Sequence, residues 1–240
     1  MGGAALLIVA GFLDGFAQGA LWAVALAIAY GVAFVRGVSG FRVHAGHFAE
    51  RHGLIVIIAL GESIVAVGVG ASGVGPGAGV IVAVVLGIAL AAALWWAYFD
   101  LVMLSAERRL SAAQGEERAR LARDSYSLLH LPMVGGIIFI VLGIEQTLAH
   151  VGEPLGTIPA VELCGGVALY LLGHNAFRLR EEGSVSVPRL VVAVLCLALI
   201  PVAVSVPSLI TLAVLALVLC GLATFETATS REVRRELRGR

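Results

Sequence analysis

The feature that most constrains this chain is a series of apolar runs, each long enough to cross a lipid bilayer. A spanning helix needs about 20 mostly apolar residues, and such runs lie at about 17–35, 53–71, 79–103, 127–149, 158–177, 188–205 and 207–225. Backbone polar groups in lipid must be hydrogen-bonded within their own segment, and these runs are too long for barrel strands. The sequence therefore predicts an all-α, polytopic transmembrane bundle with about seven full spans.

The arginines test these spans independently of hydropathy. All sixteen basic residues are arginine. They fall in alternate connections, at 36–51, 108–123 and 178–189, and in the tail 226–240. Connections rich in basic residues lie on the cytoplasmic side of a membrane. The pattern predicts a multi-pass protein of the bacterial cytoplasmic membrane with its C-terminus in the cytoplasm.

The remaining segments complete the predicted domain organisation. Residues 1–240 form a single transmembrane domain, in which 104–124 is a cytoplasmic amphipathic linker and 226–240 an arginine-rich tail. The apolar run at 3–13 ends at Asp14 and is too short to span. We expect further helices upstream in the native protein. The expected partners are the lipid bilayer and either those helices or a second copy of the chain.

Composition and motifs exclude several other classes of function. The net charge is zero, so nothing indicates a nucleic-acid partner. The three cysteines, Cys164, Cys196 and Cys220, are scattered through apolar runs and are expected to be packing residues. Nucleotide-binding and nucleophile motifs are missing from workable contexts in the sequence. We expect no cofactor.

Two local patterns have an interfacial interpretation. His44, His47 and Glu50 recur every three residues, but this spacing matches no established metal-site motif. We expect an amphipathic turn at the membrane surface there, and no metal site. The aromatic group formed by Trp95, Trp96 and Tyr98 is typical of an interfacial belt.

Glu62 is the residue whose burial in lipid is most costly. It lies in the second apolar run, eleven residues after Arg51, which is about 16 Å along a helix. An ionisable residue at a helix centre costs about 2.5–3.5 kcal/mol on insertion scales. We therefore expect Glu62, with the adjacent Ser63, to face the bundle and to be functional. Gly61 and Gly68 are expected to let a neighbouring helix approach closely.

A second group of polar residues lies near the cytoplasmic ends of the runs. Tyr126 and His130 are one helical turn apart, as are Tyr170 and His174, so each pair lies on one helix face. Because the two helices run in opposite directions, both pairs fall at a similar depth. An inner polar layer is therefore predicted, with additional candidate residues His47, Glu50, Arg51 and Asp100. Farther out are Glu145 and Glu162, together with Glu62.

Four ordered stretches resemble the bacterial low temperature requirement protein A family. They are "GHFAERHGLIVIIALGESIV" at 46–65, "LWWAYFD" at 94–100, "DSYSLLHLPMVGGIIF" at 124–139 and "LYLLGHNAFRLR" at 169–180. The resemblance implies a polytopic membrane protein, of which this chain is similar to the C-terminal two-thirds. The family name records a growth requirement in the cold, which implies a part in stress adaptation but no defined reaction.

The buried acids favour an ion or small-solute transporter or channel, and not an enzyme. A non-catalytic membrane protein for cold or stress adaptation is a second interpretation, and an intramembrane lipid-modifying enzyme a third. A transporter should line a cavity with these polar groups, whereas a lipid enzyme should open its site sideways to the bilayer. A structural protein should instead bury the same groups in closed pairs.

Overall fold

The computed structural model describes residues 2–35, 43–75, 77–100 and 102–229. Within these ranges the chain is helical, with connecting turns and one isolated β-bridge between Pro154 and Pro207. The helices are α1 (Gly2–Ala10), α2 (Gly15–Val35), α3 (Ala45–Ser72), α4 (Ala78–Phe99), α5 (Val102–Ala112), α6 (Gly115–Leu121), α7 (His130–Ala149), α8 (Thr157–Ala160), α9 (Gly166–Glu182), α10 (Val187–Ala203) and α11 (Ser208–Thr229), with two π-helical turns, η1 (Ala122–Leu128) and η2 (Val161–Gly165).

The predicted fold class is confirmed. Among the described residues, six helical stretches are long and apolar enough to cross a membrane, and α10 is a shorter apolar helix of 17 residues. The break expected at Pro207 is present, because α10 ends at Ala203 and α11 begins at Ser208. The protein is therefore a multi-pass helical membrane protein.

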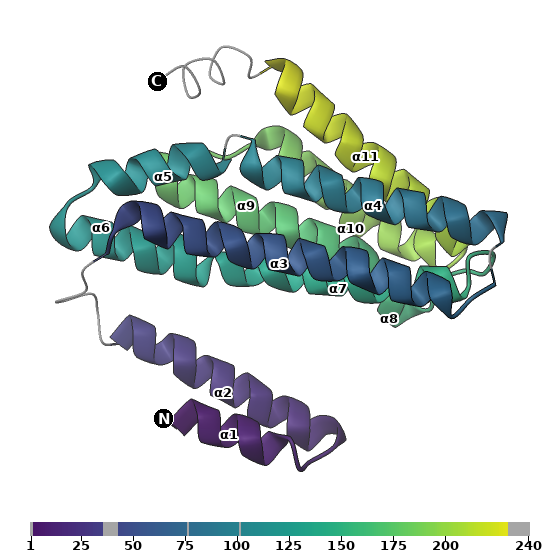
Figure 1. Ribbon diagram of the computed structural model, residues 1–240, viewed down its shortest axis with the longest axis horizontal. Helices are drawn as coiled ribbons and strands as arrows, with labels where there is room; N and C mark the ends of the chain where they lie inside the picture. The colour runs from purple at the N-terminus through teal and green to yellow at the C-terminus, as the bar shows by residue number, and fades with distance from the viewer. Residues whose placement is uncertain (1, 36–42, 76, 101, 230–240) are drawn as a thin grey trace.

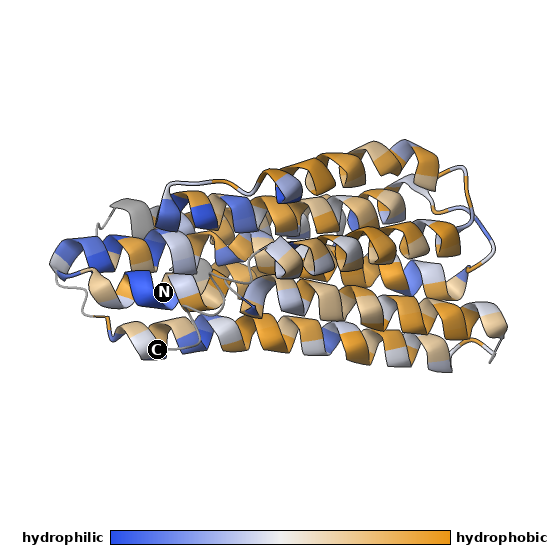
Figure 2. Ribbon diagram, turned by 90° about the horizontal axis from the view of Figure 1, so that it is seen from above, coloured by the Kyte–Doolittle hydropathy of each residue, from blue (hydrophilic) through white to orange (hydrophobic). Residues whose placement is uncertain are grey.

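The helices form an elongated bundle from which one hairpin stands apart. Helices α3, α4, α7, α9, α10 and α11 lie side by side, and α5 and α6 extend the bundle at one end (Figure 1). Helices α1 and α2 pack against each other below α3 and α7 (Figure 1). Hydrophilic residues gather at the end that holds α5 and α6, whereas the middle of the bundle is hydrophobic (Figure 2).

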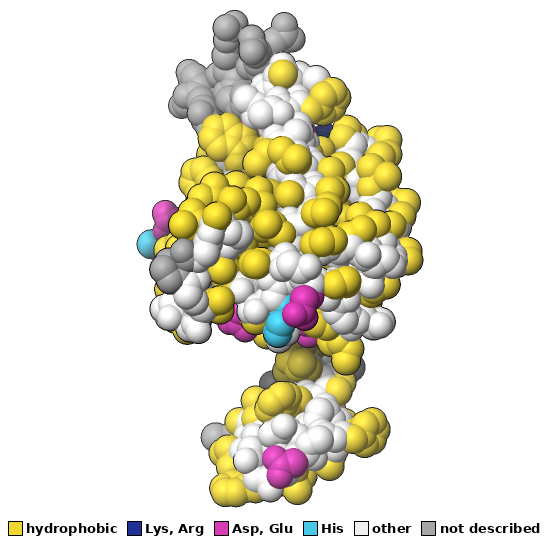
Figure 3. Space-filling model, turned by 90° about the vertical axis from the view of Figure 1, so that its right-hand side faces the viewer, with side chains coloured by type: hydrophobic (Ala, Val, Ile, Leu, Met, Phe, Trp, Pro, Cys, Tyr) yellow, Lys and Arg dark blue, Asp and Glu magenta, His cyan; other side chains and the backbone are white. Residues whose placement is uncertain are grey.

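The polar end of the bundle contains the segment predicted as a linker. Helices α5 and α6 meet at Ala113 and Gln114, and Gly115 adopts a positive φ of 53° that favours glycine. From α6 the chain continues through η1 directly into α7. At the other end of the bundle, acidic side chains and histidine are visible but almost no basic ones (Figure 3).

Glycines allow α7 and α9 to approach closely. A Cβ atom added to Gly136 would lie 2.7 Å from the Gly166 carbonyl oxygen, and one added to Gly166 would lie 2.8 Å from the Gly136 carbonyl oxygen. Seven residues farther along each helix, about two turns, added Cβ atoms at Gly143 and Gly173 would meet Leu163 and Met133 at 2.5 and 2.8 Å. Small residues at such interfaces are the usual means by which membrane helices pack. This contact fixes the positions of the tyrosines and histidines on α9 relative to those on α7.

The predicted tail overlaps the end of α11. The tail was expected to begin at 226, but α11 continues to Thr229 and Glu226 lies on it. Residues 230–240 and the arginines at 36 and 42 lie outside the described residues.

Candidate functional site

A buried cluster of histidines and tyrosines surrounds the ring of Tyr98 near the polar end of the bundle. Its ring centroid lies 5.6 Å from that of His130 and 5.7 Å from that of His174. The rings of Tyr126 and His130 are stacked, and Tyr170 lies 4.5 Å from His174. We call this group the histidine–tyrosine cluster, and its members are His52, Tyr98, Tyr126, His130, Tyr170 and His174.

The hydrogen bonds of His130 define its tautomer. Its Nδ1 lies 3.2 Å from the Ser125 carbonyl oxygen, which can only accept, so Nδ1 carries the proton. A neutral ring then accepts at Nε2, where the Tyr98 hydroxyl lies at 2.8 Å and donates. The π-helical turn η1 supplies this geometry, because the Ser125 carbonyl is five residues before His130. Such turns often occur at functional sites.

On the other side of Tyr98, Arg189 binds His174. A guanidinium NH₂ of Arg189 donates to His174 Nδ1 at 3.0 Å. Since a guanidinium has no acceptor, His174 Nδ1 is unprotonated and the ring proton lies on Nε2. Arg189 also forms a bidentate pair with Glu226, at 2.7 and 2.8 Å, and donates to the Ala97 carbonyl oxygen at 3.1 Å. The guanidinium therefore links α10, α9, α11 and α4.

The Arg189–Glu226 pair forms one wall of a polar pocket of about 410 Å³. Its charged lining residues are Asp100, Arg178, Glu182, Arg189 and Glu226. The pocket lies where α4, α9, α10 and α11 meet, at the polar end of the bundle. A charged compartment is thus in contact with the buried cluster through Arg189.

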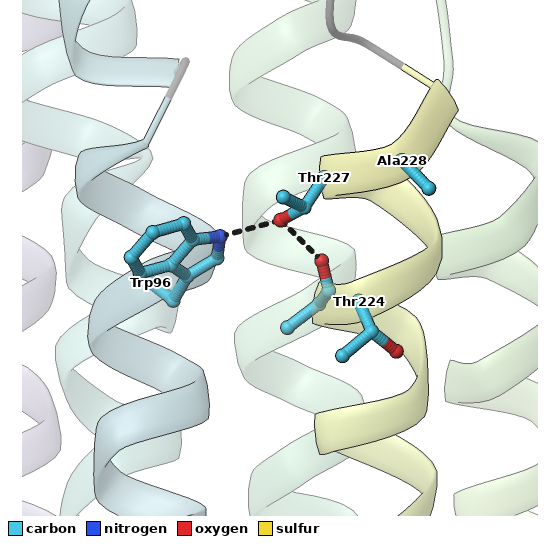
Figure 4. Close-up of a pocket in the computed structure, with 5 residues that line it drawn as sticks. Trp96, Thr224, Thr227 and Ala228 are labelled. Atoms are coloured by element: carbon cyan, nitrogen blue, oxygen red, sulfur yellow. Dashed lines mark hydrogen bonds between the residues drawn. The ribbon is translucent and has the colours of Figure 1, made fainter.

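An apolar pocket of about 400 Å³ adjoins the polar pocket and shares Trp96 with it. The Trp96 indole N–H donates to the Thr227 hydroxyl at 2.9 Å, and that hydroxyl donates to the Ala223 carbonyl oxygen at 2.7 Å (Figure 4). This contact ties the end of α4 to α11. The lining of the apolar pocket includes no ionisable side chain among the described residues.

Several buried polar atoms near the cluster lack a hydrogen-bond partner within the described residues. They include the Tyr126 hydroxyl and His174 Nε2. Both side chains are almost fully buried, at 1% and 0% exposure. Buried donors without partners are rare and costly in folded proteins. The cluster therefore retains hydrogen-bonding capacity that the described part of the chain does not use.

Four of the residues predicted for the inner layer come together in this cluster. Tyr126, His130, Tyr170 and His174 are all buried there. Tyr170 additionally donates to the Leu94 carbonyl oxygen at 2.7 Å. Asp100 is also buried and lines the polar pocket.

The other inner-layer candidates lie apart from the cluster. His47, Glu50 and Arg51 are exposed, and His47 pairs with Glu50 at 3.5 Å. The inner layer expected from helix periodicity is thus smaller than predicted on the α3 side. His52, one residue beyond Arg51, supplies that side instead, with its ring centroid 5.0 Å from that of His130.

The prediction that the Glu62 side chain faces the bundle was wrong. Its side chain is exposed on the outer surface between α3 and α7 and does not face the bundle. Ser63 takes the inward position and donates to the Ala59 carbonyl oxygen within α3. Glu145 is exposed and Glu162 half-buried. Position along a helix sets the depth of a residue, but its rotation about the axis depends on which neighbours cover which face.

Sequence reasoning missed Tyr98, Arg189 and Glu226. Tyr98 was grouped with the interfacial tryptophans, but it is buried while Trp95 and Trp96 are exposed. Arg189 was counted only as a topology marker. Its place in the first turn of α10 was a usable signal, because a cation there opposes the helix dipole and indicates a specific partner.

Comparison with known proteins agrees with this architecture. The family model for the bacterial low temperature requirement A protein matches residues 1–224. An uncharacterized protein of Rhizobium meliloti (strain 1021) is 32% identical over 164 residues, which cover 64% of this chain and 39% of the relative. The chain thus spans about two-fifths of that relative's length. No solved structure matches. By the extent of the family match, the chain belongs to the bacterial low temperature requirement A protein family.

Proposed function

We propose that this protein is a membrane transport protein in which the histidine–tyrosine cluster exchanges protons with the polar pocket. The observation that carries the proposal is the contiguous series of titratable side chains from His52 through His130, Tyr98 and His174 to the Arg189–Glu226 pair. Ring contacts join His52 to His130 and Tyr98 to His174, and hydrogen bonds join the other members. Histidine changes charge near neutral pH. Within membrane bundles, ionisable residues of this kind mark ion and proton pathways.

The hydrogen bonds suggest how proton uptake is coupled to the pocket. With Arg189 donating to Nδ1 and the ring proton on Nε2, His174 has no lone pair free to take a proton. Proton uptake by His174 therefore requires Arg189 to withdraw. Protonation of Glu226 weakens the bidentate pair that holds the guanidinium in place. A proton entering from the pocket would thus release Arg189 first and be accepted by His174 next.

The arginine distribution gives the direction of this path. The pocket lies at the end of the bundle that the positive-inside rule assigns to the cytoplasm. Proton exchange with the pocket is accordingly proposed on the cytoplasmic side.

Proton flux into liposomes tests the proposal. The purified protein is reconstituted with a pH-sensitive dye inside the vesicles, and a potassium gradient with valinomycin drives proton entry. We expect flux above that of protein-free vesicles, at least a ten-fold loss in His174→Gln and His130→Gln, and no loss in the control His150→Gln, whose side chain is exposed. Unchanged flux in both cluster variants, or no flux in the wild type, would refute the proposal, provided that each variant elutes as folded protein.

A non-catalytic role in the membrane is the second candidate. The pairs Tyr98–His130 and Arg189–Glu226 are closed, which is the arrangement expected of groups that only hold helices together. The same flux measurement separates the two functions. A structural role predicts that His130→Gln lowers the thermal stability of the protein while the wild type carries no protons.

A further inference from the structure

A groove on the outer surface of the bundle is lined, among the described residues, by apolar side chains and one ionisable side chain, Glu62. Its lining residues are Ile55, Ile58, Ala59 and Glu62 from α3 and Val134, Ile138, Val141 and Leu142 from α7, and it has a volume of about 350 Å³. We call it the α3/α7 groove. Glu62 is exposed there, without a hydrogen bond or ion pair to any described residue.

This surface is poorly suited to contact with lipid alone. A carboxyl group at this depth costs about 2.5–3.5 kcal/mol on insertion scales. The groove lining also includes the small residue Ala59 on α3. In membrane proteins, small residues on a helix surface allow another helix to approach closely. The groove therefore has the features of a helix-binding surface. Its Glu62 carboxyl group would be stabilised by a hydrogen-bond donor on the helix that binds there.

Helix α2 has a matching surface without a partner. Its small residues recur every fourth position and form one face: Gly15, Gly19, Ala23, Ala27 and Gly31. That face is opposite Ala25, which is buried against α1. Cβ atoms added to Gly19 and Gly31 would meet nothing within 4 Å. Tyr30 shares the small-residue face, three residues after Ala27.

The connection between α2 and α3 brings these surfaces within reach. Helix α2 ends at Val35 and α3 begins at Ala45, with the undescribed residues 36–42 in between. The nine residues of the connection, 36–44, extend to about 32 Å at most. The two helices run in opposite directions, with α2 on the side of α3 and α7 (Figure 1). Helices that follow each other in sequence usually pack together.

Depth in the membrane matches as well. In the sequence Arg36 follows α2 directly and Arg51 lies near the start of α3. Counted along the sequence from these two arginines, Tyr30 lies six residues in and Glu62 eleven. Tyr30 and Glu62 differ by five residues in depth, about 7.5 Å. Helical side chains tilt toward the N-terminus of their helix, so in antiparallel helices these two tilt toward each other.

We propose that the α3/α7 groove is the docking site for the small-residue face of α2 from the same chain, with the Tyr30 hydroxyl donating a hydrogen bond to Glu62. Docking covers the carboxyl group and satisfies it in a low-dielectric setting, and it buries two surfaces that otherwise contact only lipid. Glu62 is then an anchoring residue for α2, which is separate from the histidine–tyrosine cluster.

Disulfide cross-linking in native membranes tests this docking. Ala27→Cys is combined with Ala59→Cys, in a chain whose Cys164, Cys196 and Cys220 are replaced by alanine, and oxidised with copper phenanthroline. The control pair is Ala27→Cys with Val85→Cys, which lies on the exposed face of α4. We expect the first pair to lose both of its maleimide-reactive thiols at least ten-fold faster than the control, at the mass of a monomer.

The other results overturn the proposal. Equal rates for the two pairs would mean that α2 is not docked in the groove, and a disulfide-linked dimer would assign the groove to a second copy. If the cysteine-free protein does not reach the membrane, cross-linking of the Ala27→Cys and Ala59→Cys pair is measured in the native sequence instead. Cys164 and Cys196 are buried there.

Cross-linking rates of further variants test the Tyr30–Glu62 hydrogen bond. If Tyr30 binds Glu62, Tyr30→Phe should slow cross-linking several-fold, and adding Glu62→Leu should slow it no further. Independent, multiplying effects of the two substitutions would rule out the hydrogen bond.

Discussion

At the scale of single residues, the decisive group is the Arg189 guanidinium. Its side chain is 9% exposed, and it contacts a carboxylate, an imidazole and a backbone carbonyl at once. Desolvating two charges is expensive, so such a pair is not by itself a source of stability. It does impose a strong constraint, because removal of one partner leaves the other charged and buried.

Arg189 and Glu226 should therefore behave as a unit. We expect Arg189→Met to destabilise the folded protein by about 3–5 kcal/mol, and Arg189→Met with Glu226→Leu to be more stable than that single variant. The exposed pair offers a control: Arg178→Met, which removes the partner of Glu182, should cost no more than about 1 kcal/mol. Denaturant unfolding in detergent measures all three. A double variant less stable than Arg189→Met would contradict this account.

At the scale of helices, α7 and α9 are held together by backbone contact between glycines. Neither of the facing glycines at 136 and 166 has room for a methyl group, since the nearest atoms belong to the backbone of the opposite helix. The cluster depends on this contact, because Tyr126 and His130 precede α7 or begin it, while Tyr170 and His174 lie on α9. A separation of these helices would move the two halves of the cluster apart.

Adjacent glycines on α7 provide a matched pair of substitutions. Gly135→Ala meets no atom within 4 Å and should be neutral or stabilising by up to about 1 kcal/mol through helix propensity. Gly136→Ala should destabilise despite the same gain, because its Cβ would lie 2.7 Å from the Gly166 oxygen. Thermal unfolding in detergent compares them. Equal melting temperatures would show that α7 and α9 can separate without loss of stability.

At the scale of the whole molecule, the bundle is polarised along its length. Charged residues and the helices α5 and α6 occupy one end, and short connections poor in basic residues occupy the other (Figures 1 and 2). Ser72, the last residue of α3, and Gly152, in the connection after α7, lie at the second end, and Gln114 lies between α5 and α6. This asymmetry is the structural counterpart of the arginine distribution.

Labelling of introduced cysteines tests the orientation. Ser72→Cys and Gly152→Cys should react with a membrane-impermeant maleimide in intact cells. Gln114→Cys should react only after the cells are opened, because its connection is assigned to the cytoplasm by the positive-inside rule. Labelling of position 114 in intact cells would reverse the orientation, and with it the side on which the polar pocket opens.

The sequence by itself determined the membrane class, the approximate spans and four of the six members of the histidine–tyrosine cluster. Those features depend on local properties: run length sets whether a helix crosses lipid, and the four-residue spacing of Tyr126 with His130 and of Tyr170 with His174 puts each pair on one face. The family membership also followed from contiguous motifs, which require no knowledge of contacts.

Only the tertiary structure decided which faces are covered. In the sequence Tyr98 was interpreted as an interfacial residue and Arg189 as a topology marker. Both became central once α4 and α10 packed against α9. Glu62 read as a buried residue and proved to be exposed. The physical reason is that hydropathy fixes depth in the membrane, whereas the rotation of a helix about its axis follows from close packing with its neighbours. When every face of a helix is apolar, no periodicity in the sequence records that rotation.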